Sequence, residues 1–486
     1  MNVPVIFALL VVPLLATVVA AWNRSEAINH RVTLLAGMGH LVASLYCLIA
    51  QRNPFPAGWW IAVDPLGAFF LVILSHTFVL VALYSPRFLR RMEGHEYDRS
   101  KRLFYPALNF YLLANTLVLV VQQFTLLWVV LELTTFSLVP LMYFYRTKES
   151  LEAVWKYLFL VSIGLVFLFV GILFLGRSAR GVVDPSAFTA SGLTQAAARL
   201  NPLWLKASFI FVLVGLSAKI GLAPMHPGDI DATSNAPAPI AALMAGSLRS
   251  TAVLALLRFY QVVGATDVRQ FAQRLLIIAG LASLAIAAIY MWRSRNYKRL
   301  LAYSSVEHLG IIALGIGIGG VALLGALLHL LFNSFGKVAL FLMAGNIHQN
   351  YGSREIDAIS ALSKRLPWTG LLWGFAFFYI VGTPPFGIFF SELLLLRGMI
   401  HGANWLPLVL FLTLLMVIFI SLGRAVLRML QTPNSAVVVN EQVERFNASH
   451  ALGLYAMTLS IPLALFQPAP LFDPLRAILI NFGVVL

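Results

Sequence analysis

Cysteine is nearly absent from this chain, since Cys47 is the only one among 486 residues. One cysteine cannot form a disulfide framework or a CxxC pair, and it cannot supply the set of thiolates that holds an iron–sulfur cluster. The sequence also contains no nucleophile, metal-ligand or phosphate-loop pattern. We therefore expect no metal, no bound cofactor and no catalytic residues, so that any redox chemistry would belong to another chain.

Charged residues are also scarce, at 11% of the chain, whereas 60% of the residues are hydrophobic and the mean hydropathy is +0.86. So little polar surface excludes a soluble protein of this length, and apolar runs of about 20 residues recur from end to end. The sequence therefore predicts an all-α polytopic membrane protein. The net charge of +15 does not indicate nucleic acid binding, because the cations lie in short clusters between apolar runs.

The apolar runs predict about fourteen membrane-spanning helices in a single membrane domain, residues 1–486. The connections are too short for a soluble domain. The first run lacks a basic segment before it and is long enough to span, so we expect a retained helix rather than a cleaved signal peptide. The expected spans are residues 3–22, 32–50, 63–84, 104–121, 123–145, 153–176, 204–226, 236–262, 273–292, 300–319, 321–346, 367–400, 405–430 and 450–466. The apolar tail 468–486 is expected to lie along the membrane interface or to add a partial span.

Lysine and arginine gather in alternate connections, with the densest clusters in residues 85–103 and 293–299. By the positive-inside rule the crowded side is cytoplasmic, and both termini then lie on the opposite side. A miscounted helix would have scrambled this alternation. We therefore expect a multi-pass protein of the bacterial cytoplasmic (inner) membrane.

Two apolar segments are interrupted by proline-rich breaks, and each carries an ionisable residue at membrane depth. Lys219 precedes the break Gly221 to Pro227, and Glu392 follows the break Gly382 to Gly387. A charge within a spanning helix costs a few kcal/mol at least, and broken helices at matching places in two halves of a chain are typical of a transport site. The sequence therefore indicates an ion path, with a pair of kinked structural helices as the alternative.

A buried carboxylate in the first half offers Lys219 a counterion. Glu132 lies about ten residues from either end of its span, where an unpaired carboxylate would be costly. Burial favours neutral lysine and a nearby carboxylate favours charged lysine, so movement of the carboxylate would load or unload the proton. We expect Glu132 and Lys219 to make a direct or single-water contact. The alternative is a static ion pair that only fixes helix packing.

The second half contains Lys337, with His329 eight residues before it on the same helix face and Glu392 on the next helix. The spacing places His329 and Lys337 roughly 12 Å apart, a gap that a water or two could bridge. Histidine relays protons readily. A lone histidine on an apolar face is, however, often only a packing residue, so this alternative stays open for His329 and His308.

Two further sites carry charge closer to the ends of their spans. Glu307 and His308 follow the basic connection 293–299, and either a cytoplasmic proton entrance or a simple interfacial pair would explain them. Lys156 is four residues after Glu152 on the same face, and it either joins the line of charges or extends its amine to the interface.

Several motifs together resemble the antiporter-like subunits of respiratory complex I and, most closely, the component F class of hydrogenase-4-type membrane complexes. They are WVVLELTTF, SLEAVWKYLF, AKIGLAPMH, RNYKRLLAYSSVEHLGIIALGIG, LLHLLFNSFGKVALFLMAGN and GTPPFGIFFSELLLL. The resemblance implies a fourteen-helix core with two broken helices and two inverted five-helix repeats, here 103–262 and 273–430. It also implies that Glu132, Lys219, Lys337 and Glu392 are the proton-handling residues.

The chain departs from the family pattern at four positions. Thr233 stands where the family has histidine, Asn235 where it has glutamate, and Asn333 where it has histidine. Ser250 stands where many relatives have lysine, with Arg249 beside it. None of these side chains exchanges a proton near neutral pH. The connection between the two halves is therefore the weakest part of the expected path.

The sequence as a whole predicts a proton-translocating subunit of an energy-converting complex, with Na⁺ as the less favoured ion. Its partners would be other membrane subunits, the lipid bilayer and a peripheral redox or hydrating subunit on the cytoplasmic side, and no nucleic acid. One alternative is the ion-conducting partner of an inorganic-carbon uptake complex. A second is a degenerate scaffold subunit whose ion path has closed.

Overall fold

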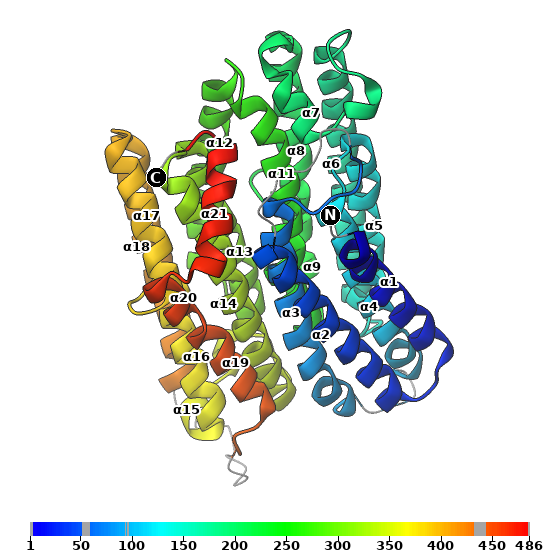
Figure 1. Ribbon diagram of the computed structural model, residues 1–486. Coiled ribbons are helices and arrows are strands. Elements are labelled where there is room, and N and C mark those ends of the chain that lie inside the picture. The colour runs from blue at the N-terminus through cyan, green and yellow to red at the C-terminus, as the bar shows by residue number, and fades with distance from the viewer. Residues whose placement is uncertain (1–2, 51–58, 93, 95–96, 432–443, 485–486) are drawn as a thin grey trace.

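The computed structural model describes residues 3–50, 59–92, 94, 97–431 and 444–484. In this part of the chain the helices pack side by side, and most long helices run between the upper and lower ends of the bundle in Figure 1. Thirteen of the described helices are long and apolar enough to cross a membrane. The broken pair α16 and α17 adds one further span, so the predicted all-α polytopic fold with about fourteen spans is confirmed.

The helices follow one another with short connections. The first half contains α1 (Val3–Trp22), α2 (Glu26–Ala50), α3 (Pro65–Arg90), α4 (Asp98–Val120), α5 (Phe124–Met142), α6 (Lys148–Ser178), α7 (Ala190–Gln195), α8 (Pro202–Ile220), α9 (Pro227–Asn235), α10 (Ala238–Leu243) and α11 (Arg249–Gly264). The second half contains α12 (Arg269–Arg293), α13 (Tyr297–Ile318), α14 (Val321–Tyr351), α15 (Leu362–Arg365), α16 (Pro367–Ile380), α17 (Gly387–His401), α18 (Trp405–Gln431), α19 (Ala448–Thr458), α20 (Ser460–Phe466) and α21 (Ala469–Asn481).

The break predicted from Gly221 to Pro227 lies between α8 and α9. Asn201 caps the start of α8 by accepting hydrogen bonds from two backbone amides of the first turn. The helix ends at Ile220 because Gly221 adopts φ +90°, a left-handed conformation that favours glycine. The chain then forms the short helix α9, so that α8 and α9 together make one broken span. The second predicted break divides α16 from α17 in the same way.

Burial differs strongly between helices. The segment Ala238–Gly264, which joins α10 to α11 through a π-helical turn, is enclosed along its length, and so is α14. Helices α1 and α18 instead expose most of their side chains. Arg249 and Lys337 therefore lie on the two innermost helices, where an ionisable side chain is shielded from lipid.

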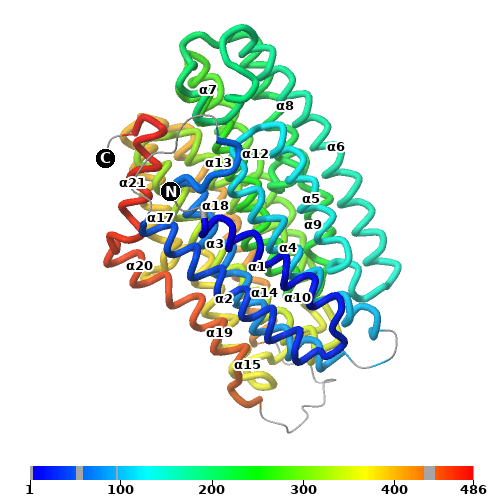
Figure 2. Tube along the Cα trace, turned by 45° about the vertical axis from the view of Figure 1, so that its right-hand side comes forward, coloured from blue at the N-terminus to red at the C-terminus, as the bar shows by residue number. Residues whose placement is uncertain are grey.

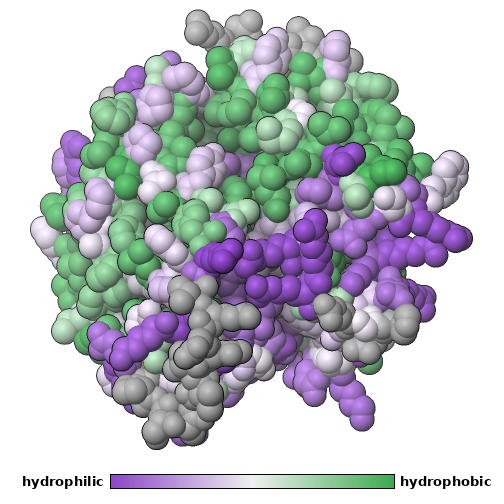
Figure 3. Space-filling view, turned by 90° about the horizontal axis from the view of Figure 1, so that it is seen from below, coloured by the Kyte–Doolittle hydropathy of each residue, from purple (hydrophilic) through white to green (hydrophobic). Residues whose placement is uncertain are grey.

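Hydrophilic residues gather across the lower end of the bundle, as Figure 3 shows from below. This distribution agrees with the clustering of cations in alternate connections. Helix α1 begins and α21 ends in the upper half of Figure 1, away from that end. The helices from the two ends of the chain lie together, because α21 packs against α2 and α3, and α19 packs against α3 and α14 (Figure 2).

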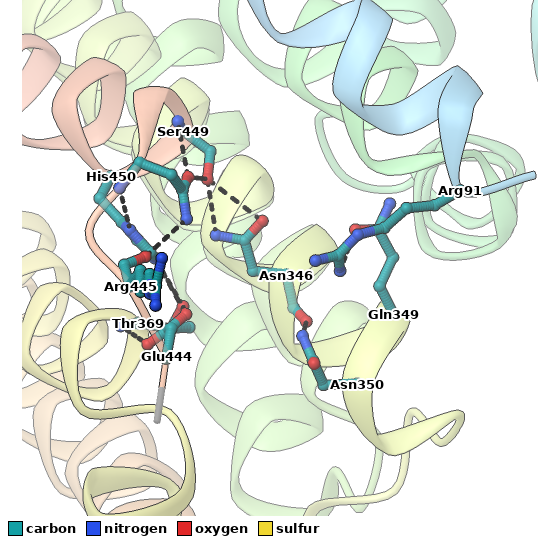
Figure 4. A network of polar contacts seen from close by, with 10 residues as sticks. Arg91, Asn346, Gln349, Asn350, Thr369, Glu444, Arg445, Ser449 and His450 are labelled. Carbon is teal, nitrogen blue, oxygen red and sulfur yellow. Dashed lines mark hydrogen bonds and ion pairs between the residues drawn. The ribbon is translucent and has the colours of Figure 1, made fainter. Parts of the chain in front are cut away.

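A polar network attaches the start of α19 to α16 and α14 (Figure 4). The Glu444 carboxylate accepts hydrogen bonds from the Thr369 amide at 2.9 Å and hydroxyl at 2.6 Å, and lies 3.0 Å from His450 Nε2. Asn346 donates to the Ser449 hydroxyl at 3.0 Å. Burial alone would raise the pKa of the Glu444 carboxyl, but the hydrogen bonds from His450 and Thr369 outweigh it and hold the pKa below its usual range.

The apolar tail of the chain forms α21. Leu475 and Leu479 are fully buried against the bundle, and the Phe482 ring stacks on Tyr260 with 5.9 Å between ring centroids. This packing makes the described part of the tail a component of the helix bundle.

Candidate functional site

Lys219 is buried in the last turn of α8, with only 1% of the residue exposed. Its Nζ donates hydrogen bonds to the Leu131 carbonyl at 2.9 Å and to Thr135 Oγ1 at 2.7 Å, both on α5. These acceptors flank Glu132 in sequence and lie one turn of helix apart. The lysine is therefore held by neutral oxygens on the same stretch of helix that carries the predicted carboxylate.

Glu132 has its hydrogen-bond partner on α6. Its Oε1 accepts a hydrogen bond from Ser162 at 3.2 Å, and its Oε2 is buried without a partner among the described residues. The contacts described for Lys219 include no direct ion pair with Glu132. The direct form of the predicted contact is therefore wrong, because the two side chains take different partners. A bridge through one water stays a prediction.

The two helix breaks share one arrangement. Gly221 in the first break has φ +90° and Gly382 in the second has φ +68°. A Cβ at Gly221 would collide with the Asp229 carboxylate, and a Cβ at Gly382 would collide with the Glu392 carboxylate. In both cases the carboxylate comes from the helix after the break and reaches back over the glycine.

Asp229 is a buried acid that the sequence motifs did not single out. It forms an ion pair with Arg249 Nη2, and each of the two side chains is only 1% exposed. The same Nη2 donates to Thr233 Oγ1 at 2.8 Å. The sequence did contain one signal for it, since Asp229 follows Gly221, the glycine of the broken apolar span, by eight residues. Arg249 and Thr233, both noted from the sequence, are thus brought together by this third residue.

Lys337 in the second half has surroundings like those of Lys219. Its Nζ donates to Ser304 Oγ at 2.8 Å and to the Leu301 carbonyl at 3.4 Å, both on α13. Glu307 lies three residues beyond Ser304 on the same helix and is buried. Each lysine is therefore held by one carbonyl and one hydroxyl, with an acid close by on the helix that supplies them.

His308 and His329 form a pair inside the bundle. His308 Nδ1 lies 2.9 Å from His329 Nε2, and His329 Nδ1 lies 3.0 Å from the Ser391 hydroxyl. Ser391 directly precedes Glu392. Of the two alternatives for Glu307 and His308, the interfacial pair disagrees with the structure, because α13 begins at Tyr297 and both residues are buried. The cytoplasmic proton entrance stays a prediction.

Lys156 lies apart from these groups. Half of its side chain is exposed, and its Nζ contacts Glu152 at 2.6 Å and Asp231 at 3.5 Å. Asp231 also pairs with Arg299 at 3.3 Å. Lys156 thus belongs to a solvent-accessible cluster of charged side chains with Glu152, Asp231 and Arg299, in agreement with the interfacial alternative.

The four departures from the family pattern occupy buried or partly buried positions. Asn235 accepts a hydrogen bond from Arg354 at 2.8 Å, and Ser250 Oγ lies 3.4 Å from Ser334 Oγ on α14. Asn333 Oδ1 has no partner among the described residues. In the described part of the chain, no group of three or more His, Cys, Asp or Glu side chains is arranged to hold a metal ion.

Comparison with known proteins agrees with this architecture. Residues 122–419 match the family described as NADH:quinone oxidoreductase/Mrp antiporter, TM. The hydrogenase-4 component F homologue of Methylacidiphilum infernorum is 34% identical in a match covering 80% of this chain and 83% of that protein. The hydrogenase-4 component B of Escherichia coli is 29% identical, with 68% of this chain and 49% of that protein covered.

Solved structures share the fold at low sequence identity. A chain of the archaeal membrane-bound sulfane sulfur reductase superposes with a TM-score of 0.85 at 21% identity, covering 99% of this chain and 97% of that one. A chain of the Mrp complex from Dietzia sp. DQ12-45-1b gives a TM-score of 0.84 at 17% identity, with 99% and 100% covered. The resemblance inferred from the sequence motifs is confirmed, and this chain belongs to the NADH:quinone oxidoreductase/Mrp antiporter family as an antiporter-like membrane subunit.

Proposed function

We propose that this chain translocates protons as one subunit of a multisubunit energy-converting membrane complex of the hydrogenase-4 or complex I type. The observation that carries the proposal is the pair of fully enclosed lysines, Lys219 and Lys337, each held by a carbonyl and a hydroxyl. Neutral acceptors of this kind stabilise a lysine without the strong charge pairing that would prevent it from releasing a proton.

In the first half, Glu132 would control the charge on Lys219. With its carboxylate bound to Ser162, as in the structure, the lysine lacks a directly contacting anion and releases its proton more readily. Rotation of the carboxylate toward Lys219 favours the ammonium form and reloads it. Lysine suits this step because its amine can lose a proton, whereas arginine remains charged.

In the second half, the route would run from Lys337 and Glu307 through the histidine pair to Glu392. The contacts His308 to His329 and His329 to Ser391 support it, since each lies within hydrogen-bonding distance. Glu392 would pass the proton to the far membrane surface. The second half is thus the better preserved of the two routes.

Several finer features belong to the same proposal. The subunit would reside in the bacterial cytoplasmic membrane with both termini on the non-cytoplasmic side, as the cation clusters favour. Its partners would be further membrane subunits and a peripheral redox or hydrating subunit. Burial of two lysines, two histidines and two acids argues against the scaffold alternative, because a sequence that no longer moves ions has little reason to retain such costly groups.

The test uses the complex that co-purifies with this chain from its native host, reconstituted into liposomes that contain a pH-sensitive dye. Lys219→Ala should abolish or strongly reduce proton movement while assembly of the complex is retained. Lys219→Arg should also impair it, because arginine does not release its proton. Lys206→Ala is the matched control, since Lys206 lies on the same helix and is exposed. Full activity in Lys219→Arg would show that the site needs only a structural cation.

A further inference from the structure

The connection between the two halves contains a buried acid at the place where family histidines and lysine are missing. Thr233 and Ser250 cannot exchange protons near neutral pH. Thr233, however, shares the Arg249 guanidinium with Asp229, and Ser250 is the next residue after Arg249. The titratable carboxylate of Asp229 therefore lies beside the two positions, Thr233 and Ser250, at which the family has residues that exchange protons.

Polar atoms around this carboxylate are left without protein partners. Asp229 Oδ1, Arg249 Nε, Arg249 Nη1 and the Tyr157 hydroxyl are all buried and have no partner among the described residues. Buried polar atoms are normally satisfied, and where protein groups do not reach them ordered water does. The ion pair uses one carboxylate oxygen and leaves Oδ1 available to a water molecule.

Contacts lead from this site toward both lysines. On one side, the Asp229 carboxylate lies over Gly221, which is two residues after Lys219. On the other side, Ser250, the residue after Arg249, contacts Ser334, which is three residues before Lys337 on α14. Asp229 and its partner Arg249 thus lie between Lys219 and Lys337.

The likeness of the two helix breaks supports a functional role for this acid. Asp229 lies over Gly221 as Glu392 lies over Gly382, each in a break whose glycine has a positive φ. Glu392 is the acid that the family resemblance assigns to the second break. An acid in the matching place of the first break would complete the pattern with a residue that the family motif does not contain.

We propose that Asp229 is the proton-carrying group of the connection between the two halves, and that Arg249 is the fixed cation that stabilises its ionised form. A proton that leaves the Lys219 ammonium crosses by bound water and forms an O–H bond at Asp229 Oδ1. It then leaves that oxygen and binds the Lys337 amine, so that no group other than the proton is transferred. Arg249 remains charged throughout. The inference rests on the proposed proton translocation.

The experiment compares Asp229→Asn with Asp64→Asn in the native complex reconstituted into dye-loaded liposomes. Asp64 is the matched control because it also pairs with a buried arginine, Arg258, at 3.2 Å. Asp229→Asn should lower the number of protons moved per turnover of the driving reaction, because asparagine cannot carry the proton. Asp64→Asn should weaken packing and leave that ratio unchanged. An unchanged ratio in Asp229→Asn would overturn the inference.

Two further measurements separate a proton carrier from a structural ion pair. A carboxylic acid band in the infrared difference spectrum between energised and resting complex should vanish in Asp229→Asn and persist in Asp64→Asn. Should Asp229→Asn fail to assemble, Thr233→Asp in the same chain returns a carboxylate to the Arg249 guanidinium and should restore both assembly and the band. Assembly restored without the band would identify a purely structural pair.

Lys219→Ala, measured alongside, tests the proposed proton translocation separately from the role of Asp229. Loss of proton movement in Lys219→Ala with a wild-type ratio in Asp229→Asn would overturn only the role of Asp229. Wild-type proton movement in Lys219→Ala would overturn the proposed function itself.

Discussion

His308 Nδ1 and His329 Nε2 lie 2.9 Å apart at the buried contact between α13 and α14. Two imidazoles at this distance share one hydrogen, so one ring donates while the other accepts. The remaining nitrogen of His329 contacts Ser391, while His308 Nε2 has no partner among the described residues. The pair therefore has one end attached to the Glu392 helix and one end, His308 Nε2, without a described partner.

Replacement of His329 by leucine should interrupt this relay. Since a positioned acid–base group typically contributes 100-fold or more to proton transfer, His329→Leu should slow proton movement by about 100-fold. His76→Phe is the control, because His76 is also a buried histidine and packs on Phe335 with 4.5 Å between ring centroids. If the pH-sensitive dye showed equal losses of proton movement in the two variants, His329 would act only through packing.

Gly382 in the second break should be required for two reasons: it adopts a positive φ, and it leaves room for the Glu392 carboxylate. Gly382→Ala places a methyl group against the Glu392 carboxylate and should reduce proton movement. Gly352→Ala is the control, because Gly352 has φ +67° but open space around it. Both variants should lose about 1 kcal/mol of stability from the left-handed backbone. Retention of full proton movement by Gly382→Ala would contradict the placement of Glu392.

Much of the fold follows directly from the sequence. Long apolar runs and alternating cation clusters predicted the spans, and the Gly221 and Gly382 breaks were visible as proline-rich interruptions. What was missed is the separate helix α9 after the first break, because hydropathy does not record the direction of the backbone after a glycine with positive φ.

The candidate site was only partly predictable. Spacing placed Lys219 and Lys337 inside the bundle, but it could not show that the partners of each lysine would be a carbonyl and a hydroxyl. Those partners depend on side-chain direction between neighbouring helices. Asp229 was not predicted because the family motif points to Thr233 and Asn235, whereas Asp229 acquires its role only through contact with Arg249.

The polar network at Glu444 predicts a pH-dependent stability difference. Hydrogen bonds hold the pKa of Glu444 below its usual range in the folded protein, so this stabilisation is complete above the unfolded pKa of about 4.3 and is lost as the pH falls through the lower folded value. Glu444→Gln should therefore lower the unfolding temperature at pH 7, and the difference from wild type should shrink under acid conditions.

The control for this measurement is Glu355→Gln, since Glu355 is exposed. Circular dichroism of the purified complex at a fixed heating rate gives both unfolding temperatures. A difference between Glu444→Gln and wild type that grew as the pH fell would contradict the assigned direction.

If Lys219 and Lys337 carry protons through this chain, the loss of either lysine should change the ratio of protons moved to turnovers of the driving reaction. The measurement compares Lys219→Ala, Lys337→Ala and wild type within the reconstituted native complex. We expect that both variants assemble, that both lower the ratio, and that Lys337→Ala lowers it further because the second half is the better preserved route. Wild-type ratios in both variants would contradict the claim and favour a scaffold subunit.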